Sequence, residues 1–240
     1  MKNKSLVLQR VSFIIFTLAV LLGICLTLAS AWPDMEAFFY GFDDFTNEKL
    51  TTLSCPVLMT SQDRKQITIK LHNPNDEAIV RKVEADFSSR LAILNYPAIL
   101  EFQPGETKIV AWDIGEENID LNHFIFVSVR AYPSRDLDLV ESTCGIMVLN
   151  LPFKGGPVIF YVVLVLAALG LGVGLWMWTR HSDLSEPGAE SQSRFMRFLA
   201  GVIIVGVVGS FFGNWLIGLL SLVAMLLTWS VFLYPRRNTA

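Results

Sequence analysis

The side chains that could bind a metal ion are few and stand next to turns. His72 and His123 lie at the ends of alternating stretches, and Glu116, Glu117 and Asp120 form a short acidic segment. Two imidazoles with a carboxylate could hold a transition metal, and an acidic loop could attract calcium. Ordinary solvated turns contain the same residues, and they are far more common. We therefore expect no metal site and no cofactor.

One glycine pattern is similar to a nucleotide-binding loop. The stretch "GLGVG" covers residues 170–174, but it lies inside a long apolar run and does not follow a strand, as a phosphate-binding loop would. Close packing of membrane helices explains the pattern better. The chain also has no G-x-S-x-G, H-E-x-x-H, P-loop lysine or EF-hand spacing. We expect a protein that is not an enzyme, with no catalytic residues and no nucleic-acid partner.

Cys55 and Cys144 are the cysteines that could form a disulfide. They lie at the beginning and the end of a polar region, and two cysteines of an extracytoplasmic domain most often pair. A disulfide there would close a loop of about 90 residues and stabilise the fold by about 4–5 kcal/mol in the chain-entropy model. The alternative is two buried free thiols. The remaining cysteine, Cys25, lies in an apolar segment.

The apolar residues are concentrated in long blocks. They make up 52% of the chain and gather at 11–32, 157–178 and 198–234. About 20 apolar residues cross a bilayer once, so the last block is too long for one helix. Gly213-Asn214 is suited to a tight turn, which divides that block into two spans at 196–213 and 214–234. The sequence therefore predicts four transmembrane helices, one N-terminal and three C-terminal.

The basic residues orient these spans. Eight of them, Lys2, Lys4, Arg10, Arg180, Arg194, Arg197, Arg236 and Arg237, fall on one face if the chain crosses four times. The positive-inside rule makes that face cytoplasmic. We expect cytoplasmic segments at 1–10, 179–195 and 235–240 in a multi-pass protein of the plasma (inner) membrane, with residues 33–156 extracytoplasmic. Segment 11–32 is predicted to be a signal anchor. The alternative is a signal peptide that is cleaved near Ala29-Ser30-Ala31.

Residues 54–156 change to an alternating pattern that is typical of strands. Turn signals such as "NPND" and "QPGE" separate the short segments. About seven strands are expected, at 55–60, 66–72, 79–87, 98–102, 107–114, 123–132 and 142–149. No strong helical stripe interrupts them, so the region predicts an antiparallel all-β sandwich.

The stretches "ITIKLHNPNDEAI", "FQPGET" and "FIFVSV", in this order, resemble bacterial immunoglobulin-like envelope modules. In such modules an asparagine-rich turn follows one strand, and a Pro-Gly turn leads into another. The resemblance covers about 80 residues of the 240. It implies an immunoglobulin-like sandwich with an adhesive or scaffolding role, and no activity.

Small and aromatic residues suggest where partners bind. Glycines repeat on helix faces and favour close packing of the second, third and fourth spans, with any spare face free for a partner: Gly170, Gly174, Gly206, Gly209, Gly213 and Gly218. Aromatic residues gather in or beside the juxtamembrane segment 33–53, as a headgroup belt or as a docking patch: Trp32, Phe38, Phe39, Tyr40, Phe42 and Phe45. The favoured function is a non-catalytic accessory or assembly subunit that binds lipid and other membrane proteins. The alternative is an extracytoplasmic sensor that signals to a separate cytoplasmic partner.

The topology makes a direct prediction for labelling in intact cells. A cysteine introduced at Ser191 lies in the segment expected to be cytoplasmic. It should not react with a membrane-impermeant thiol reagent until the cells are opened. Labelling of this cysteine in intact cells would overturn the topology.

Overall fold

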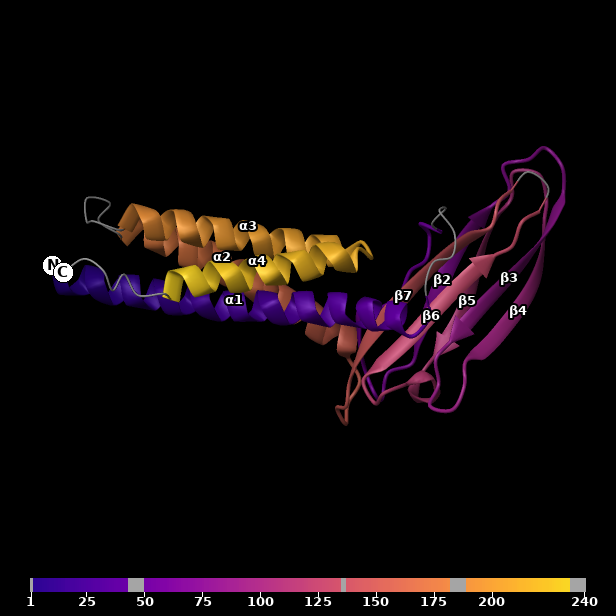
Figure 1. Ribbon diagram of the computed structural model, residues 1–240, viewed down its shortest axis with the longest axis horizontal. Coiled ribbons are helices and arrows are strands. Elements are labelled where there is room, and N and C mark those ends of the chain that lie inside the picture. The colour runs from indigo at the N-terminus through magenta and orange to yellow at the C-terminus, as the bar shows by residue number, and fades with distance from the viewer. Residues whose placement is uncertain (1, 43–49, 135–136, 182–188, 234–240) are drawn as a thin grey trace. The chain divides into compact units, whose positions relative to one another are not determined.

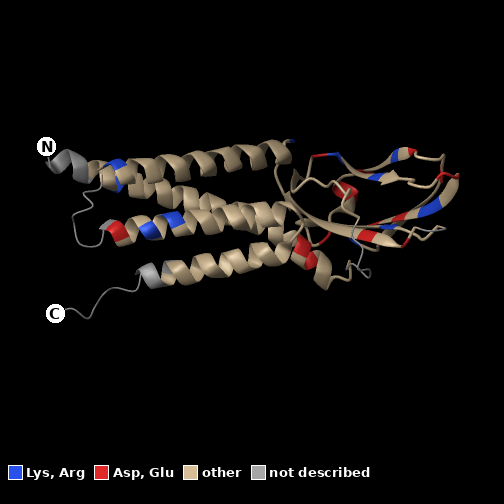
Figure 2. Ribbon diagram, turned by 90° about the horizontal axis from the view of Figure 1, so that it is seen from above, with Lys and Arg blue, Asp and Glu red and all other residues tan. Residues whose placement is uncertain are grey.

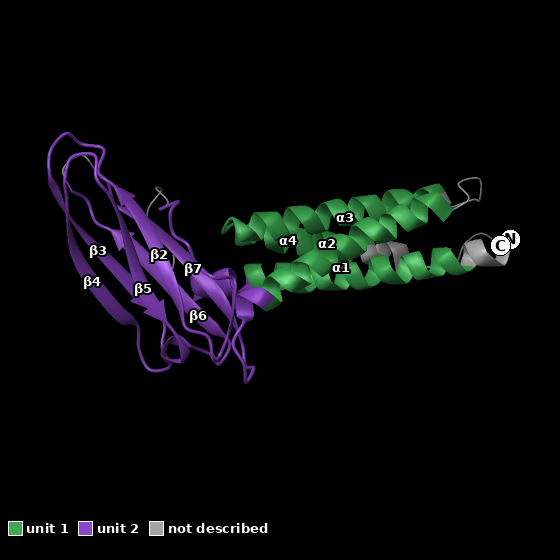
Figure 3. Ribbon diagram, turned by 180° about the vertical axis from the view of Figure 1, so that it is seen from behind, with its two compact units in different colours: residues 1–31, 159–240 green, residues 32–158 purple. Residues whose placement is uncertain are grey.

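The described residues form four α-helices and seven strands, the numbers expected from the sequence (Figure 1). The computed structural model describes residues 2–42, 50–134, 137–181 and 189–233. They divide into two compact units (Figure 3): unit 1 contains residues 1–31 and 159–240, and unit 2 contains residues 32–158. Unit 1 is helical. Unit 2 holds all the strands together with the end of the first helix and the beginning of the second.

The helices are α1 (Lys2–Phe39), α2 (Gly156–His181), α3 (Ala189–Phe211) and α4 (Trp215–Leu233). Three of them contain segments that are long and apolar enough to cross a membrane: Val7–Phe39, Gly156–His181 and Glu190–Phe211. In α4 the apolar part with described side chains, Trp215–Thr228, is shorter than a full crossing.

Two helices extend beyond the expected boundaries. Helix α1 does not end at residue 32, because it continues past Pro33 to Phe39 and includes part of the expected juxtamembrane segment 33–53. Packing of its last turns on the sheet favours this extension over the preference of proline to end a helix. Helix α3 begins at Ala189, inside the expected linker 179–195, with Glu190 in its first turn and an ion pair from Arg194 to Glu190.

The last apolar block turns back where the glycine and asparagine stand. Gly213 has a φ of +71°, and its N–H donates to the Ser210 carbonyl at 2.9 Å. The Asn214 side chain then accepts from the Ile217 N–H at 3.3 Å at the start of α4. The assignment of Gly213 to a helix face is therefore wrong, since this residue supplies the positive φ of the turn.

The glycines of α2 pack on α1. A Cβ on Gly170 would lie 2.7 Å from the Cβ of Ala19, and one on Gly174 would lie 2.9 Å from the Cβ of Phe16. The Ser12 hydroxyl donates to the Gly174 carbonyl at 2.7 Å. The spacing of these glycines predicts contacts among the second to fourth spans. They instead bring the first and second helices together, because the missing side chains let the two backbones approach.

The other glycines bring α3 and α4 together. A Cβ on Gly206 would lie 2.8 Å from the Cβ of Ser221. Gly209 faces Ile217, and Gly218 faces Ser210, with a Cβ there only 2.7 Å from the Cβ of Ala31 in α1. These small residues are all used within the bundle of unit 1.

The strands form two sheets. Their bounds are β1 (Leu58–Thr60), β2 (Lys65–His72), β3 (Ile79–Phe87), β4 (Leu94–Phe102), β5 (Thr107–Ile114), β6 (Phe124–Ala131) and β7 (Val140–Leu149). The larger sheet has the order β1-β7-β6-β3-β4, and the smaller pairs β2 with β5. The expectation of a purely antiparallel arrangement is wrong at one place, because β1 runs parallel to β7. Parallel neighbours need a long crossover connection, and here the rest of the domain, residues 61–139, connects β1 to β7.

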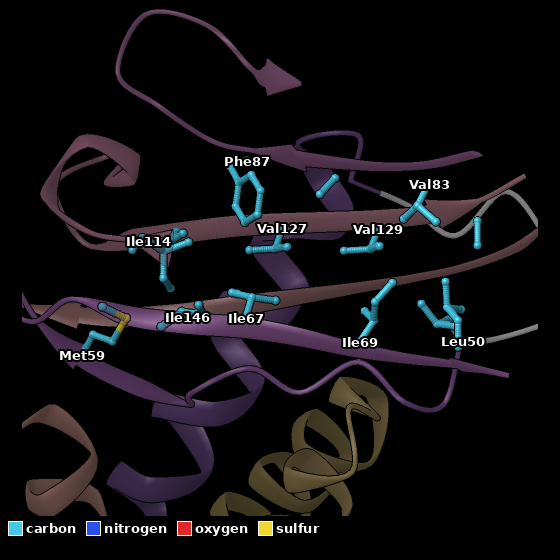
Figure 4. Packing of buried hydrophobic residues seen from close by; sticks show 14 of the residues in the cluster. Leu50, Met59, Ile67, Ile69, Val83, Phe87, Ile114, Val127, Val129 and Ile146 are labelled. Atoms are coloured by element: carbon cyan, nitrogen blue, oxygen red, sulfur yellow. The ribbon is translucent and has the colours of Figure 1, made fainter. Parts of the chain in front are cut away.

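The two sheets share one hydrophobic core (Figure 4). Alternate residues of β2, Ile67, Ile69 and Leu71, point into it and meet Val83 and Val127 from the larger sheet. Strand β6 is buried at almost every residue, because its opposite face is covered as well. Figure 4 shows Phe87, Val127, Val129 and Ile146 of the larger sheet beside Ile67 and Ile69 of the smaller one.

Two substitutions in α2 test the helix packing. Gly174→Leu should destabilise unit 1 by about 1–3 kcal/mol, because its side chain would overlap the Phe16 backbone. Gly172→Leu is the matched control, since no heavy atom lies within 4 Å of a Cβ built there. Thermal unfolding of the full chain in detergent should separate the two variants. Equal stability would show that the α1–α2 contact does not need glycine.

Candidate functional site

The end of α1 and the beginning of α2 are both fastened to β1 and β7 within unit 2. On the α1 side, the Asp34 carboxylate accepts from the backbone N–H of Gly145 at 2.6 Å. Any Cβ on Gly145 would collide with the backbone of Pro33 and Asp34. The glycine in the middle of β7 is therefore required for the close approach of the helix.

On the α2 side, Asp63 binds the beginning of the helix. Its carboxylate accepts from the N–H groups of Gly155 at 2.9 Å and Gly156 at 2.8 Å, and from that of Thr60 at 2.9 Å. The side chain is only 4% exposed. Burial by itself would raise the pKa of Asp63, but these backbone hydrogen bonds outweigh it and lower the pKa below its ordinary value. The N-terminal N–H groups of a helix have no intrahelical acceptor, and an anion suits them.

Both glycines before α2 have a structural reason. Gly155 has a φ of +133°, which other residues rarely adopt. A Cβ on Gly156 would overlap the backbone of Leu58 and Met59, so β1 and the helix start lie in direct contact. The predicted disulfide between Cys55 and Cys144 is confirmed. It adds a covalent link to this region, because Cys144 directly precedes Gly145.

The aromatic residues of the proposed patch divide into an exposed and a buried group. Trp32, Phe38, Phe39 and Tyr40, hereafter the aromatic surface, remain exposed by 44%, 42%, 70% and 49%. Phe42 is buried at 6% exposure. The sixth predicted member, Phe45, lies outside the described residues.

A buried cluster holds the aromatic surface in place. Ala37 and Phe42 pack on Phe124 and Phe126 of β6, on the face of the larger sheet that is turned away from the core. The Tyr40 ring stacks on Phe126 with centroids 5.5 Å apart. This contact explains why β6 is buried on both faces, and it fixes the helix end that carries Phe38 and Phe39.

A polar network covers the rest of that face. Arg130 is paired with Asp86 and lies 3.8 Å from Glu141, whose side chain also accepts from the Ser128 hydroxyl at 3.1 Å. Asn95 donates to Asp86 at 2.6 Å. The register of the strands brings these residues together, since Arg130 stands opposite Glu141 and Ser128 opposite Asp86.

The network continues to Glu84, whose carboxylate binds Lys82 at 2.6 Å and the Tyr132 hydroxyl at 2.6 Å. The hydrogen bond from Lys82 lowers the pKa of Glu84 and correspondingly raises the pKa of Lys82. The hydrogen bond to Glu84 raises the pKa of Tyr132. General acids and bases work best with a pKa near the ambient pH, and these shifts all move away from neutrality. The network therefore suits cross-strand stabilisation.

The side chains of three of the candidate metal ligands have partners of another kind. The His72 ring nitrogen Nδ1 lies 3.0 Å from the Thr107 hydroxyl, and Glu117 is paired with Arg64 at 3.8 Å. Asp120 accepts from the Leu121 N–H at 2.7 Å. In the described part of the chain, no three His, Cys, Asp or Glu residues are grouped so that they could hold a metal ion.

Sequence reasoning did not identify the residues of the two anchors, Asp34, Asp63, Gly145 and Gly156. The run Gly155-Gly156-Pro157 gave a local signal, because proline favours the first turn of a helix and paired glycines favour close approach. Asp63 had no such signal. Its partners lie 92 and 93 residues away in the sequence.

Comparisons with known proteins assign no family. No family model matches the sequence. No curated protein is significantly similar to it. Among solved structures, a β-glucosidase from Erythrobacter marinus matches 38% of this chain and 14% of its own length, with 19% identity and a TM-score of 0.26. The chain thus spans about one seventh of that protein, and the likeness is too low to carry an argument about fold or activity.

The anchor on α2 makes a stability prediction. Asp63→Ala should destabilise unit 2 by about 1–3 kcal/mol, because the backbone N–H groups lose their acceptor. Asp76→Ala, an exposed aspartate in the turn between β2 and β3, should have little effect. Since the folded pKa of Asp63 is lowered, the difference between parent and D63A should be present at pH 7 and shrink below about pH 4. Thermal unfolding of parent and variant at pH 7 and again below about pH 4 measures this difference in stability. A difference that persists in acid would contradict the assigned role of Asp63.

Proposed function

We propose that this is a non-catalytic accessory or assembly subunit of the plasma membrane, with unit 2 outside the cell and both chain ends in the cytoplasm. The charge distribution supports this orientation. Among the residues of unit 1 whose side chains are described, the charged ones lie at one end of its helices (Figure 2): Arg10, Arg180, Glu190, Arg194 and Arg197. The Gln9 side chain donates to the His181 carbonyl at 3.1 Å, which joins the beginning of α1 to the end of α2. Basic ends of membrane helices face the cytoplasm.

The disulfide agrees with this orientation, because such bonds form and persist in oxidising compartments. We further propose that the strands of unit 2 form an immunoglobulin-like sandwich. We also propose that α4 crosses the membrane together with the other three helices, so that the protein has four spans. Seven strands in two sheets around one core support the sandwich. The turn at Gly213 supports a fourth crossing, because it reverses the chain.

The aromatic surface is the observation that carries the subunit proposal. Its rings are exposed although the helix end that bears them is fixed by the Phe126 cluster and the Asp34 hydrogen bond. Rigid exposed aromatic side chains contribute large contact area at small entropic cost, and they are enriched where proteins bind each other. We propose that a membrane protein with a complementary apolar surface docks here.

A second candidate function is an extracytoplasmic sensor. The observation that favours it is the attachment of both α1 and α2 to neighbouring strands. A ligand that shifted β7 relative to β1 would pull on two membrane helices at once. Such a relay needs two arrangements of these strands with different ligand affinity.

Paired substitutions test the subunit proposal. Phe39→Ser changes the most exposed ring of the aromatic surface, and Tyr96→Ser changes a ring of similar type that is 46% exposed on β4. After gentle detergent extraction of the full chain, a protein present in stoichiometric amount should be lost at least several-fold from the Phe39 variant and retained by the Tyr96 variant. Equal recovery with both variants, or the lack of any stoichiometric protein, would contradict docking at this surface.

A further inference from the structure

The connections at one end of unit 2 lie beside the point where α2 attaches. Strand β3 ends at Phe87, which pairs with Val127 near the beginning of β6, and Phe124 pairs with Met147 near the end of β7. Residues 61–64, 88–93, 115–123 and 150–155 therefore meet at the same end of the sheets, hereafter the anchored end. Asp63 and the residues that precede α2 belong to this end.

The loops of the anchored end expose large apolar side chains. Leu91 is 98% exposed, Ile93 59%, Phe153 54% and Leu121 43%. The loops of the opposite end, 73–78, 103–106 and 132–139, differ. Among their described residues, none is a large hydrophobic side chain with comparable exposure. In the described part of unit 2, exposed apolar loop tips are thus confined to the end at which α2 attaches.

The backbone also holds one of these side chains outward at a cost. Leu121 has a φ of +49° and Asn122 a φ of +64°, in a region that residues other than glycine rarely adopt. Leucine is poorly suited to this conformation, and 43% of its surface nevertheless remains exposed. A surface outside the domain would cover the part that is still exposed.

Distance limits what this surface can be. Phe153 lies three residues before Gly156, where the apolar helix α2 begins. The loop 88–93 joins β3 to β4, two to three strands from β7, which is about 10–15 Å at ordinary strand spacing. An assembled bilayer that contains α2 therefore lies within reach of Leu91. Exposed Arg90 and Lys154 stand next to Leu91 and Phe153, as basic residues do beside apolar groups that enter the headgroup region.

We propose that the anchored end rests on the lipid bilayer, with Leu91, Ile93, Leu121 and Phe153 inserted at the boundary between headgroups and acyl chains. The occupant of this surface is the outer leaflet itself. The inference requires that α2 crosses a bilayer, but it does not depend on any protein that docks at the aromatic surface.

Spin labels on the full chain test this inference. Leu91→Cys and Phe153→Cys carry a nitroxide in a Cys25→Ser background, and the protein is placed in phosphatidylcholine–phosphatidylglycerol liposomes. Power saturation compares oxygen, which is concentrated in lipid, with a water-soluble nickel chelate. Ile109→Cys is the matched control, since Ile109 is 70% exposed on β5 away from the anchored end. The ratio of oxygen to nickel accessibility should be at least three-fold higher at 91 and 153 than at 109.

A label at Leu169, 60% exposed within α2, reports whether this helix is in the bilayer at all. A high ratio at 169 with a ratio at 91 equal to that at 109 would overturn the inference and leave the membrane helix in place. Low access of both reagents at 91 would overturn it too, because a protein contact and not lipid would then cover the loop. A low ratio at 169 would refute the crossing on which the inference rests.

Discussion

The start of α2 leaves backbone N–H groups that need an acceptor, and in this chain the acceptor is supplied by a turn that is distant in the sequence. Asp63 accepts from Gly155 and Gly156 while it also closes its own turn through Thr60. The contact is possible only because Gly156 lacks a side chain and lies against β1. That hydrogen-bonded carboxylate joins the turn after β1 to the beginning of α2, next to the parallel pair of β1 and β7.

The attachment of α1 also uses a carboxylate that accepts from backbone N–H, but the positions of acceptor and donor are exchanged. There the helix contributes the carboxylate, Asp34, and the strand contributes the N–H and the glycine. Asp34 binds the strand residue that follows Cys144, so the disulfide limits how far this part of β7 can move. Side-chain acceptors and missing side chains thus tie the end of α1 and the beginning of α2 to the strands within unit 2.

The parts of the fold that depend on local pattern could be predicted from the sequence. Strands β3 and β5 have the bounds that their alternation indicates, and the disulfide follows from two cysteines at the ends of one polar region. The end of α1 could not be predicted, because Pro33 favours a stop and only contacts of Ala37 and Phe42 with β6 extend the helix. The parallel strand β1 is three residues long, too short for any period to reveal its partner. The partners of the α2 glycines were also missed, since a small residue indicates close packing but not which helix approaches.

The parallel pairing of β1 with β7 has a consequence for the order of assembly. Among the described strands β1 is synthesised first, yet it pairs with the last of them, β7, in a register that joins Leu58 to Met147 and Thr60 to Leu149. Neither this pairing nor the disulfide can form until nearly the whole domain has left the ribosome. The Asp63 carboxylate likewise waits for Gly155 and Gly156, which are made directly before α2. Closure of the domain therefore comes late in synthesis, and a chain that stops before β7 leaves β1 without its strand neighbour.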